Sequence, residues 1–105
     1  MRDDASVPPM PMTVVVTRDV ADRFRGFLSS VMPEAAPGVF VGAELSKGVR
    51  ERIWTVLSEW WVDMPGGSIV LLWKDDAAPG RLGLRTLGLP PRTLADLDGA
   101  LLVRR

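Results

Sequence analysis

The sequence contains no cysteine, no histidine and no tyrosine among its 105 residues. Without cysteine there is no disulfide, no thiolate zinc site and no cysteine nucleophile. Without histidine the chain lacks the commonest general base and metal ligand, so it cannot build a Ser-His-Asp triad by itself. The missing tyrosine excludes a phenolic nucleophile. Carboxylates with a metal, or backbone and arginine electrostatics, remain, and this composition favours binding or assembly over catalysis.

Long apolar runs are also missing. The longest, Ile69–Trp73, is far shorter than the roughly 20 residues that cross a bilayer, and no charged start precedes an apolar signal segment. We therefore expect a cytoplasmic protein with no membrane partner. The net charge is zero, which argues against indiscriminate binding to nucleic acid. All but two of the 13 basic residues are arginines, however, and arginine suits bidentate contacts to phosphate.

The chain reads as one domain, residues 12–105, behind a polar, proline-rich leader at residues 1–11 that we expect to be disordered. Runs of apolar and β-branched residues predict strands. These runs are Met12–Thr17, Val39–Val41, Ser68–Lys74, Arg81–Leu87 and Ala100–Val103. We interpret Glu34–Pro37 as a turn and Leu89–Asp98 as a proline-bearing connector.

Apolar residues at helical spacing predict two helices. The first is capped by Asp19 and ends before Pro33, and the second is capped by Ser46 and ends at Met64–Gly67. The second has its apolar stripe at Val49, Ile53, Val56, Leu57, Trp60 and Trp61, with Arg50, Glu51 and Arg52 on other faces and Trp54 off the stripe.

Two helices on one face of a mainly antiparallel sheet make an α+β two-layer sandwich. A ferredoxin-like arrangement is the commonest such fold, and here it requires a short extra strand near Ala43–Leu45. The fold by itself does not identify a function, because it hosts many unrelated ones.

Basic residues occur where helices begin. Arg23 and Arg25 lie at the start of the first helix and diverge by about 200° around its axis. Lys47 and Arg50 flank the first turn of the second helix, where cations oppose the helix dipole. On the residues alone, both pairs fit either an anion site or ordinary solvated charges.

Asp19 stands where a magnesium or manganese ligand fits, but a helix cap explains it better. One carboxylate supplies few of the ligands that metal-dependent phosphodiester chemistry uses. We interpret Trp60, Trp61 and Trp73 as core or dimer-interface residues rather than as platforms for stacking unpaired bases.

Five segments carry a family resemblance, in the family's order. They are VVVT at Val14–Thr17, RFRG at Arg23–Gly26, GVFVG at Gly38–Gly42, SKGVRERIW at Ser46–Trp54 and RTLADLDG at Arg92–Gly99. With these segments the chain resembles CRISPR-associated protein 2 of subtype I-E, the smaller subunit of the complex that captures new spacers.

The resemblance implies a ferredoxin-like homodimer that pairs through its sheets and lies between two dimers of the CRISPR-associated integrase. It also implies sequence-independent contacts to double-stranded DNA. Carried over residue by residue, the phosphate contacts are Arg23, Arg25, Lys47 (or Arg50) and Arg92. Relatives carry an acidic residue directly after the first strand, where this chain has Arg18, and this departure weakens a nuclease interpretation.

The leading hypothesis is a non-catalytic, DNA-bridging subunit that needs no cofactor. The alternative is a magnesium- or manganese-dependent endonuclease, acting on RNA or DNA, with Asp19 as metal ligand. A third hypothesis is a protein interaction module that binds no nucleic acid.

Overall fold

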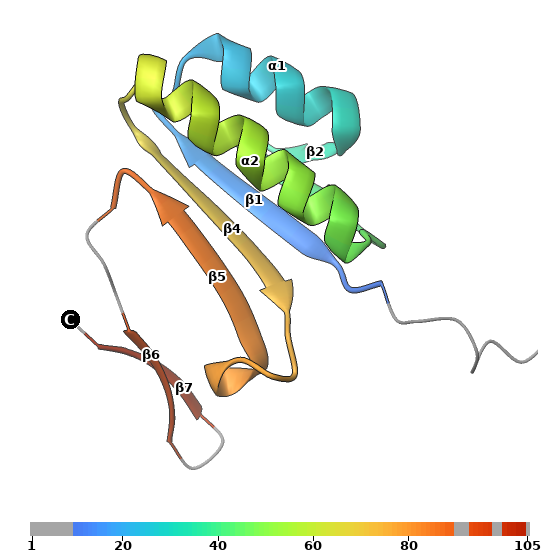
Figure 1. Ribbon diagram of the computed structural model, residues 1–105, viewed down its shortest axis with the longest axis vertical. Coiled ribbons are helices and arrows are strands. Elements are labelled where there is room, and N and C mark those ends of the chain that lie inside the picture. The colour runs from blue at the N-terminus through green and yellow to red at the C-terminus, as the bar shows by residue number, and fades with distance from the viewer. Residues whose placement is uncertain (1–9, 90–92, 98–99, 105) are drawn as a thin grey trace, which may run out of the picture.

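The computed structural model describes residues 10–89, 93–97 and 100–104, and side chains within residues 10–89. Two helices lie on one face of an antiparallel sheet, so the predicted α+β sandwich is confirmed (Figure 1). The elements are β1 (Thr13–Arg18), α1 (Asp22–Val31), β2 (Glu34–Ala36), β3 (Val39–Gly42), α2 (Lys47–Asp63), β4 (Ser68–Lys74), the 3₁₀ turn η1 (Pro79–Arg81), β5 (Leu82–Leu87), β6 (Thr93–Leu97) and β7 (Ala100–Arg104). Most of the predicted leader, residues 1–9, lies outside this description.

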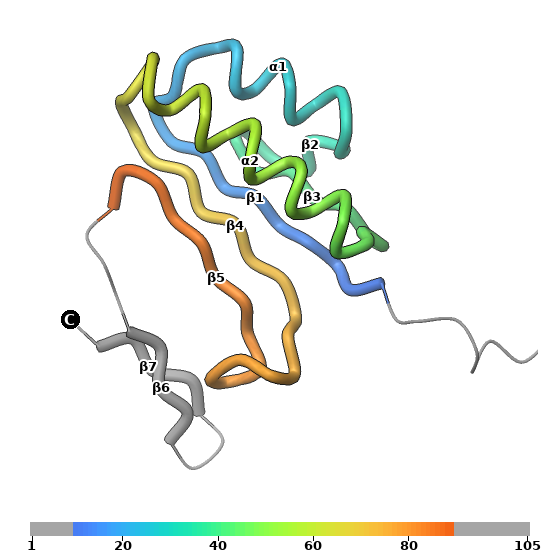
Figure 2. Tube along the Cα trace, in the orientation of Figure 1, coloured from blue at the N-terminus to red at the C-terminus, as the bar shows by residue number. Residues whose placement is uncertain are grey.

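The larger sheet has the strand order β2-β3-β1-β4-β5, with every neighbouring pair antiparallel. The order β1-α1-β2-β3-α2-β4 along the chain, with β3 and β1 central in the unit β2-β3-β1-β4, is the ferredoxin-like topology, and β5 extends the sheet beyond β4. The helices α1 and α2 run side by side over this sheet (Figure 2). A second, two-stranded antiparallel sheet consists of β6 and β7.

The extra strand that the ferredoxin-like fold requires is β2, not Ala43–Leu45. The turn predicted at Glu34–Pro37 was wrong, because Gly38 adopts φ 76° and lets Glu34–Ala36 fold back on β3. Ala43–Leu45 instead leads into the cap of α2 without forming a strand. The connector predicted at Leu89–Asp98 contains β6, whose residues pair with β7.

The predicted caps differ in outcome. Ser46 caps α2, its Oγ accepting the Val49 N–H at 3.2 Å. Asp19 does not cap α1: the N-cap is Ala21, with no side-chain hydrogen bond. Asp19 ends β1 at φ 55°, a left-handed conformation that aspartate tolerates. Neither of these two helices, in the part of the chain described, combines the length and apolar composition that a bilayer crossing needs.

The core lies between the helices and the sheet. Alternate residues of β1, β3 and β4 face the helices, and α1 and α2 contribute one stripe each. The buried apolar residues are Val15, Phe24, Leu28, Met32, Phe40, Ile53, Leu57, Ile69 and Leu71.

The inward stripe of α2 is rotated from the prediction. Arg50, Ile53 and Leu57 are the buried residues of this helix, whereas Val49 is 47% exposed. Trp54, predicted off the stripe, is half-buried and packs against the core. Ile53, Leu57, Trp60 and Trp61 of the predicted stripe are buried or pack against the core, so the difference lies mainly in Arg50 and Trp54 taking inward positions while Val49 points outward.

The sheet face away from the helices is largely apolar. The strand register aligns Val41, Val14, Leu72 and Leu84 in one row across four strands. Val16 stands in the next row and is 36% exposed. Both helices of the described chain cover the opposite face.

Candidate nucleic-acid interface

Arg23 and Arg25 project from the first turn of α1 toward different elements. The Arg23 guanidinium lies 3.9 Å from the ring centroid of Trp60 on α2. Arg25 Nη2 lies 3.1 Å from Oε2 of Glu34 at the start of β2. Both arginines are exposed. The divergence predicted from helical geometry is therefore confirmed, and each cation has its own partner.

Arg23 lies on an aromatic surface that is itself held in place. Trp60 meets Phe24 and Phe27 edge-to-face, at centroid distances of 6.0 Å and 5.3 Å. A guanidinium over an indole face is attracted by the ring electrons while its N–H groups, which lie in its own plane, stay available. Arg23 is therefore oriented without losing its capacity to contact an anion.

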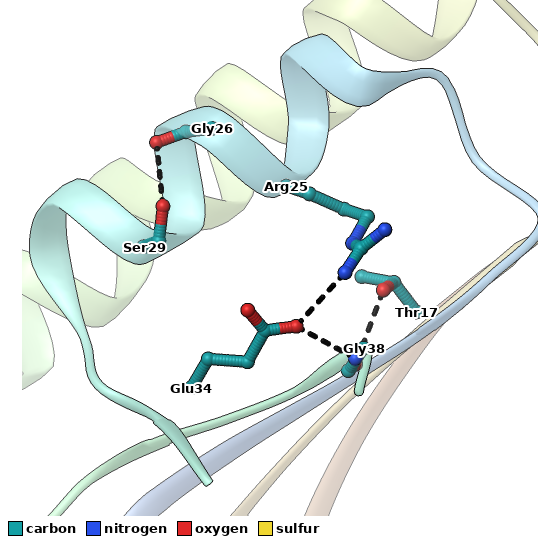
Figure 3. A network of polar contacts seen from close by, with 6 residues as sticks. All are labelled: Thr17, Arg25, Gly26, Ser29, Glu34 and Gly38. Carbon is teal, nitrogen blue, oxygen red and sulfur yellow. Dashed lines mark hydrogen bonds and ion pairs between the residues drawn. The ribbon is translucent and has the colours of Figure 1, made fainter. Parts of the chain in front are cut away.

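Arg25 belongs to a polar network at the turn between β2 and β3 (Figure 3). Glu34 Oε2 accepts the Gly38 N–H at 2.8 Å and Arg25 Nη2 at 3.1 Å. The pKa of Glu34 lies below its ordinary value, first because of the Gly38 N–H and then because of Arg25. The Gly38 carbonyl accepts the backbone N–H of Thr17 at 2.7 Å and its hydroxyl at 3.1 Å. The network thus connects α1, β1 and β2.

A second cationic group lies at the start of α2. Lys47 and Arg50 line a hollow of about 410 Å³ together with Lys74, next to the acidic side chains of Asp75 and Asp76. Lys47 is exposed. Lys74 Nζ lies 3.8 Å from the Asp76 carboxylate, in a pair whose side chains are more than half exposed. Such exposed pairs are weak, so both lysines remain accessible to a phosphate.

Arg50 differs from the other candidates, because it is only 6% exposed. Its guanidinium stacks 4.4 Å from the ring centroid of Trp73 on β4. Its Nε has no hydrogen-bond partner among the residues described. Arg85 approaches the same ring at 5.8 Å and pairs with Glu51 at 2.9 Å. Arg50 is therefore a core cation that borders the hollow.

The predicted residues form two groups rather than one. Arg50 and Trp60, ten residues apart on α2, are separated by about 15 Å along its axis. The start of α1 and the start of α2 lie near opposite ends of the helical layer (Figure 1). The first carries Arg23 and Arg25, and the second carries Lys47 and Arg50. Arg92 lies outside the described residues.

Asp19 offers a single carboxylate at the end of β1. Two-metal phosphodiester chemistry uses several acidic ligands. Across the ranges that the structure covers, no group of three or more histidine, cysteine, aspartate or glutamate side chains gathers to hold a metal ion. Within the described residues of one chain, Asp19 is therefore not part of a ready-made set of metal ligands.

Four residues beside the candidate cations were not identified from the sequence as site residues: Glu34, Trp60 and Trp73, which contact arginines, and Lys74, which borders the hollow. Glu34 was interpreted as part of a turn, and Trp60 as core or dimer interface. Only Lys74 had a sequence signal, since it is the last residue of the apolar run Ser68–Lys74 and so lies at the sheet end where the next loop begins.

The chain was compared with models of known protein families. The chain matches a family model described as CRISPR-associated protein (Cas_Cas2CT1978) over residues 12–102. The match covers all the elements of the larger sheet and both helices.

Proposed function

Since the chain belongs to the CRISPR-associated protein 2 family, we propose that it is a non-catalytic, DNA-bridging subunit of a subtype I-E spacer-acquisition complex. In this role a homodimer joins two dimers of the CRISPR-associated integrase. The homodimer holds the middle of a duplex through its phosphates, without reading base sequence.

The observation that carries the proposal is the state of the two arginines at the first turn of α1. Arg23 and Arg25 are both exposed and both oriented by a partner, Trp60 or Glu34. The N-terminal end of a helix adds partial positive charge and unpaired amides. Two oriented cations at such a position favour a phosphate backbone as ligand.

The cations at the start of α2 support a second contact. Lys47, at the start of α2, and Lys74, at the end of β4, border one hollow. Lys47 lies thirteen residues, about 20 Å, from Trp60 along α2. A ligand that meets both groups has to be extended and repetitively charged, as a duplex backbone is. Arg92, which the family resemblance adds, completes the proposed set of contacts.

The open sheet face supports the homodimer. Val14, Val41, Leu72 and Leu84 align across it, and a contiguous apolar surface of this kind typically marks a protein interface. Pairing two copies through this face leaves the helices, with their cations, on the outer surfaces of the dimer. The arrangement is compatible with a duplex that crosses both protomers.

The proposal is tested by size-exclusion chromatography with light scattering, on the protein mixed with its integrase and a short duplex. Wild type is expected to form a ternary particle. The double variant Arg23→Ala, Arg25→Ala is expected to keep the protein complex and lose the DNA. Arg52→Ala is the control for lost charge, because Arg52 is exposed on α2 and belongs to neither cationic group.

Salt dependence gives the second readout. Each phosphate contact contributes about 0.9 to the slope of log affinity against log salt on duplex DNA. Losing one contact per protomer of a homodimer therefore lowers the slope by about 1.8. Wild-type affinity that hardly changes with salt would exclude the phosphate contacts. Equal losses in Arg52→Ala and Arg23→Ala would show that only total charge matters.

A further inference from the structure

Glu34 makes two contacts with a single carboxylate oxygen. Oε2 accepts the backbone N–H of Gly38 at 2.8 Å and Arg25 Nη2 at 3.1 Å. The first contact ties the carboxylate to the turn between β2 and β3. The second ties α1 to that turn, nine residues away along the chain. Glu34 is therefore the link between Arg25 and the sheet (Figure 3).

The turn that holds Glu34 is itself fixed. Gly38 has φ 76°, and a Cβ there would lie 2.7 Å from the Thr17 carbonyl oxygen. Its carbonyl accepts two hydrogen bonds from Thr17, a buried residue of the central strand β1. Because the carboxylate is anchored to a backbone position that tolerates only glycine, its oxygen occupies a defined point beside α1.

Arg25 keeps most of its binding capacity in this arrangement. The guanidinium has five N–H donors, and one nitrogen contacts Glu34. The side chain is 46% exposed, and it borders a shallow hollow of about 310 Å³ with Ala36 and Pro37. Its remaining donors are available to a phosphate at this hollow.

We propose that Glu34 is a positioning residue for Arg25, which it holds in the orientation that contacts a DNA phosphate. The proposal rests on the function proposed above, in which Arg25 is such a contact. Arginine loses much rotamer freedom when it is ordered. A partner that orders it before DNA arrives reduces that loss on binding.

The negative charge of Glu34 acts on DNA affinity in the opposite direction to positioning. A carboxylate beside a phosphate site repels the phosphate, so removing it would tighten binding if repulsion were its main effect. Positioning and repulsion therefore predict changes of opposite sign, and Glu34 variants separate them.

The experiment measures the affinity of the integrase complex for a labelled duplex by fluorescence anisotropy. Glu34→Ala is expected to weaken binding about twofold to tenfold, the range set by ordering one long side chain. Glu34→Gln, which keeps an acceptor oxygen of the same reach, is expected to bind within about twofold of wild type by the same reasoning. Glu34→Asp keeps the charge but loses reach, and is expected to weaken binding as Glu34→Ala does.

The double variant Arg25→Ala, Glu34→Ala tests whether Glu34 acts through Arg25. The loss caused by Glu34→Ala is expected to disappear in the Arg25→Ala background, since coupled residues are not additive. Binding by Glu34→Ala and Glu34→Asp that equals or exceeds wild type would overturn the positioning role.

Failure of the proposed function gives a different result. If Arg25→Ala itself binds DNA like wild type, then Arg25 is not a phosphate contact and both proposals fail at this site. If Arg25→Ala weakens binding but neither Glu34→Ala nor Glu34→Asp does, only the positioning role fails. Should Glu34→Ala not fold, Glu34→Asp and Glu34→Gln still decide the question.

Discussion

Replacing Arg50 with methionine tests whether its buried charge is necessary for the fold. Arg50 is 6% exposed and has an unpaired Nε within the residues described. The contact that compensates the burial of this charge is the ring of Trp73, whose centroid lies 4.4 Å from the guanidinium. Methionine is of similar length, is apolar and is flexible enough to fill the same space. We expect Arg50→Met to keep or raise the free energy of unfolding, with a loss of no more than about 1 kcal/mol.

The magnitude follows from opposing contributions. Losing a desolvated cation–π contact costs about 2 kcal/mol. Removing a buried, unpaired donor recovers about 1–3 kcal/mol, and a sulfur–aromatic contact adds about 0.3–1.5 kcal/mol. The sum of these contributions runs from about 0.7 kcal/mol of destabilisation to about 2.5 kcal/mol of stabilisation relative to wild type. Arg50→Ala, which leaves a cavity, is expected to cost about 2–5 kcal/mol, as for other large buried side chains.

The assay is urea denaturation followed by tryptophan fluorescence, at two protein concentrations. The second concentration is needed because the stability of a homodimer depends on protomer concentration. A loss of 3 kcal/mol or more in Arg50→Met would refute the reasoning. Breaking a compensated buried ion pair costs about 3–5 kcal/mol, so that result would mean that an anionic partner balances Arg50. The same variant reports on DNA binding, since a stable protein with weakened binding would assign Arg50 to the phosphate contacts.

The pKa of Glu34 is lowered in the folded state, so its ionised form stabilises the fold. This stabilisation is present above the ordinary pKa of 4.5 and is lost as pH falls through the lower folded-state pKa. The difference in urea midpoint between wild type and Glu34→Gln is expected to shrink below that pH. Gly83→Ala adds a Cβ 2.1 Å from an atom of the Trp73 ring and is expected to cost about 1–3 kcal/mol of stability. Gly26 lies in a helix, and a Cβ there would have nothing within 4 Å, so Gly26→Ala is expected to stabilise by about 0.5–1 kcal/mol. Thermal melts compare the two variants, and equal effects would contradict the packing argument. Val16→Glu, on the open sheet face, is expected to yield monomers by light scattering. The control Val62→Glu changes a residue of α2 that is 80% exposed and is expected to keep the wild-type mass. A dimer in both variants would place the interface elsewhere.

Local patterns were sufficient for most elements of the fold. The β-branched run Met12–Thr17 and the apolar run Ser68–Lys74 predicted strands, and the structure has β1 at Thr13–Arg18 and β4 at Ser68–Lys74, because such residues suit buried strands. Ser46 caps α2 as predicted, since a cap depends on residues within one turn. Asp19 shows the limit of this reasoning, because aspartate suits both helix caps and turns. In the structure Asp19 has φ 55°, and Ala21 is the N-cap of α1.

The strand β2 could not be identified from its own sequence. Glu34–Ala36 has no apolar alternation, and all three residues are exposed. Its strand conformation depends on pairing with β3 and on the positive φ of Gly38. A strand defined by its neighbour rather than by its composition becomes evident only in the folded structure.

By itself, the sequence determined the fold class, the family resemblance and the identities of the candidate cations, because these depend on residue type and spacing along the chain. The tertiary structure alone decided what each cation contacts. It placed Arg50 under Trp73, Arg23 on Trp60 and Arg25 beside Glu34. The physical reason is that a charge acquires its burial and its partners from elements distant in the sequence, and these meet only when the helices pack on the sheet.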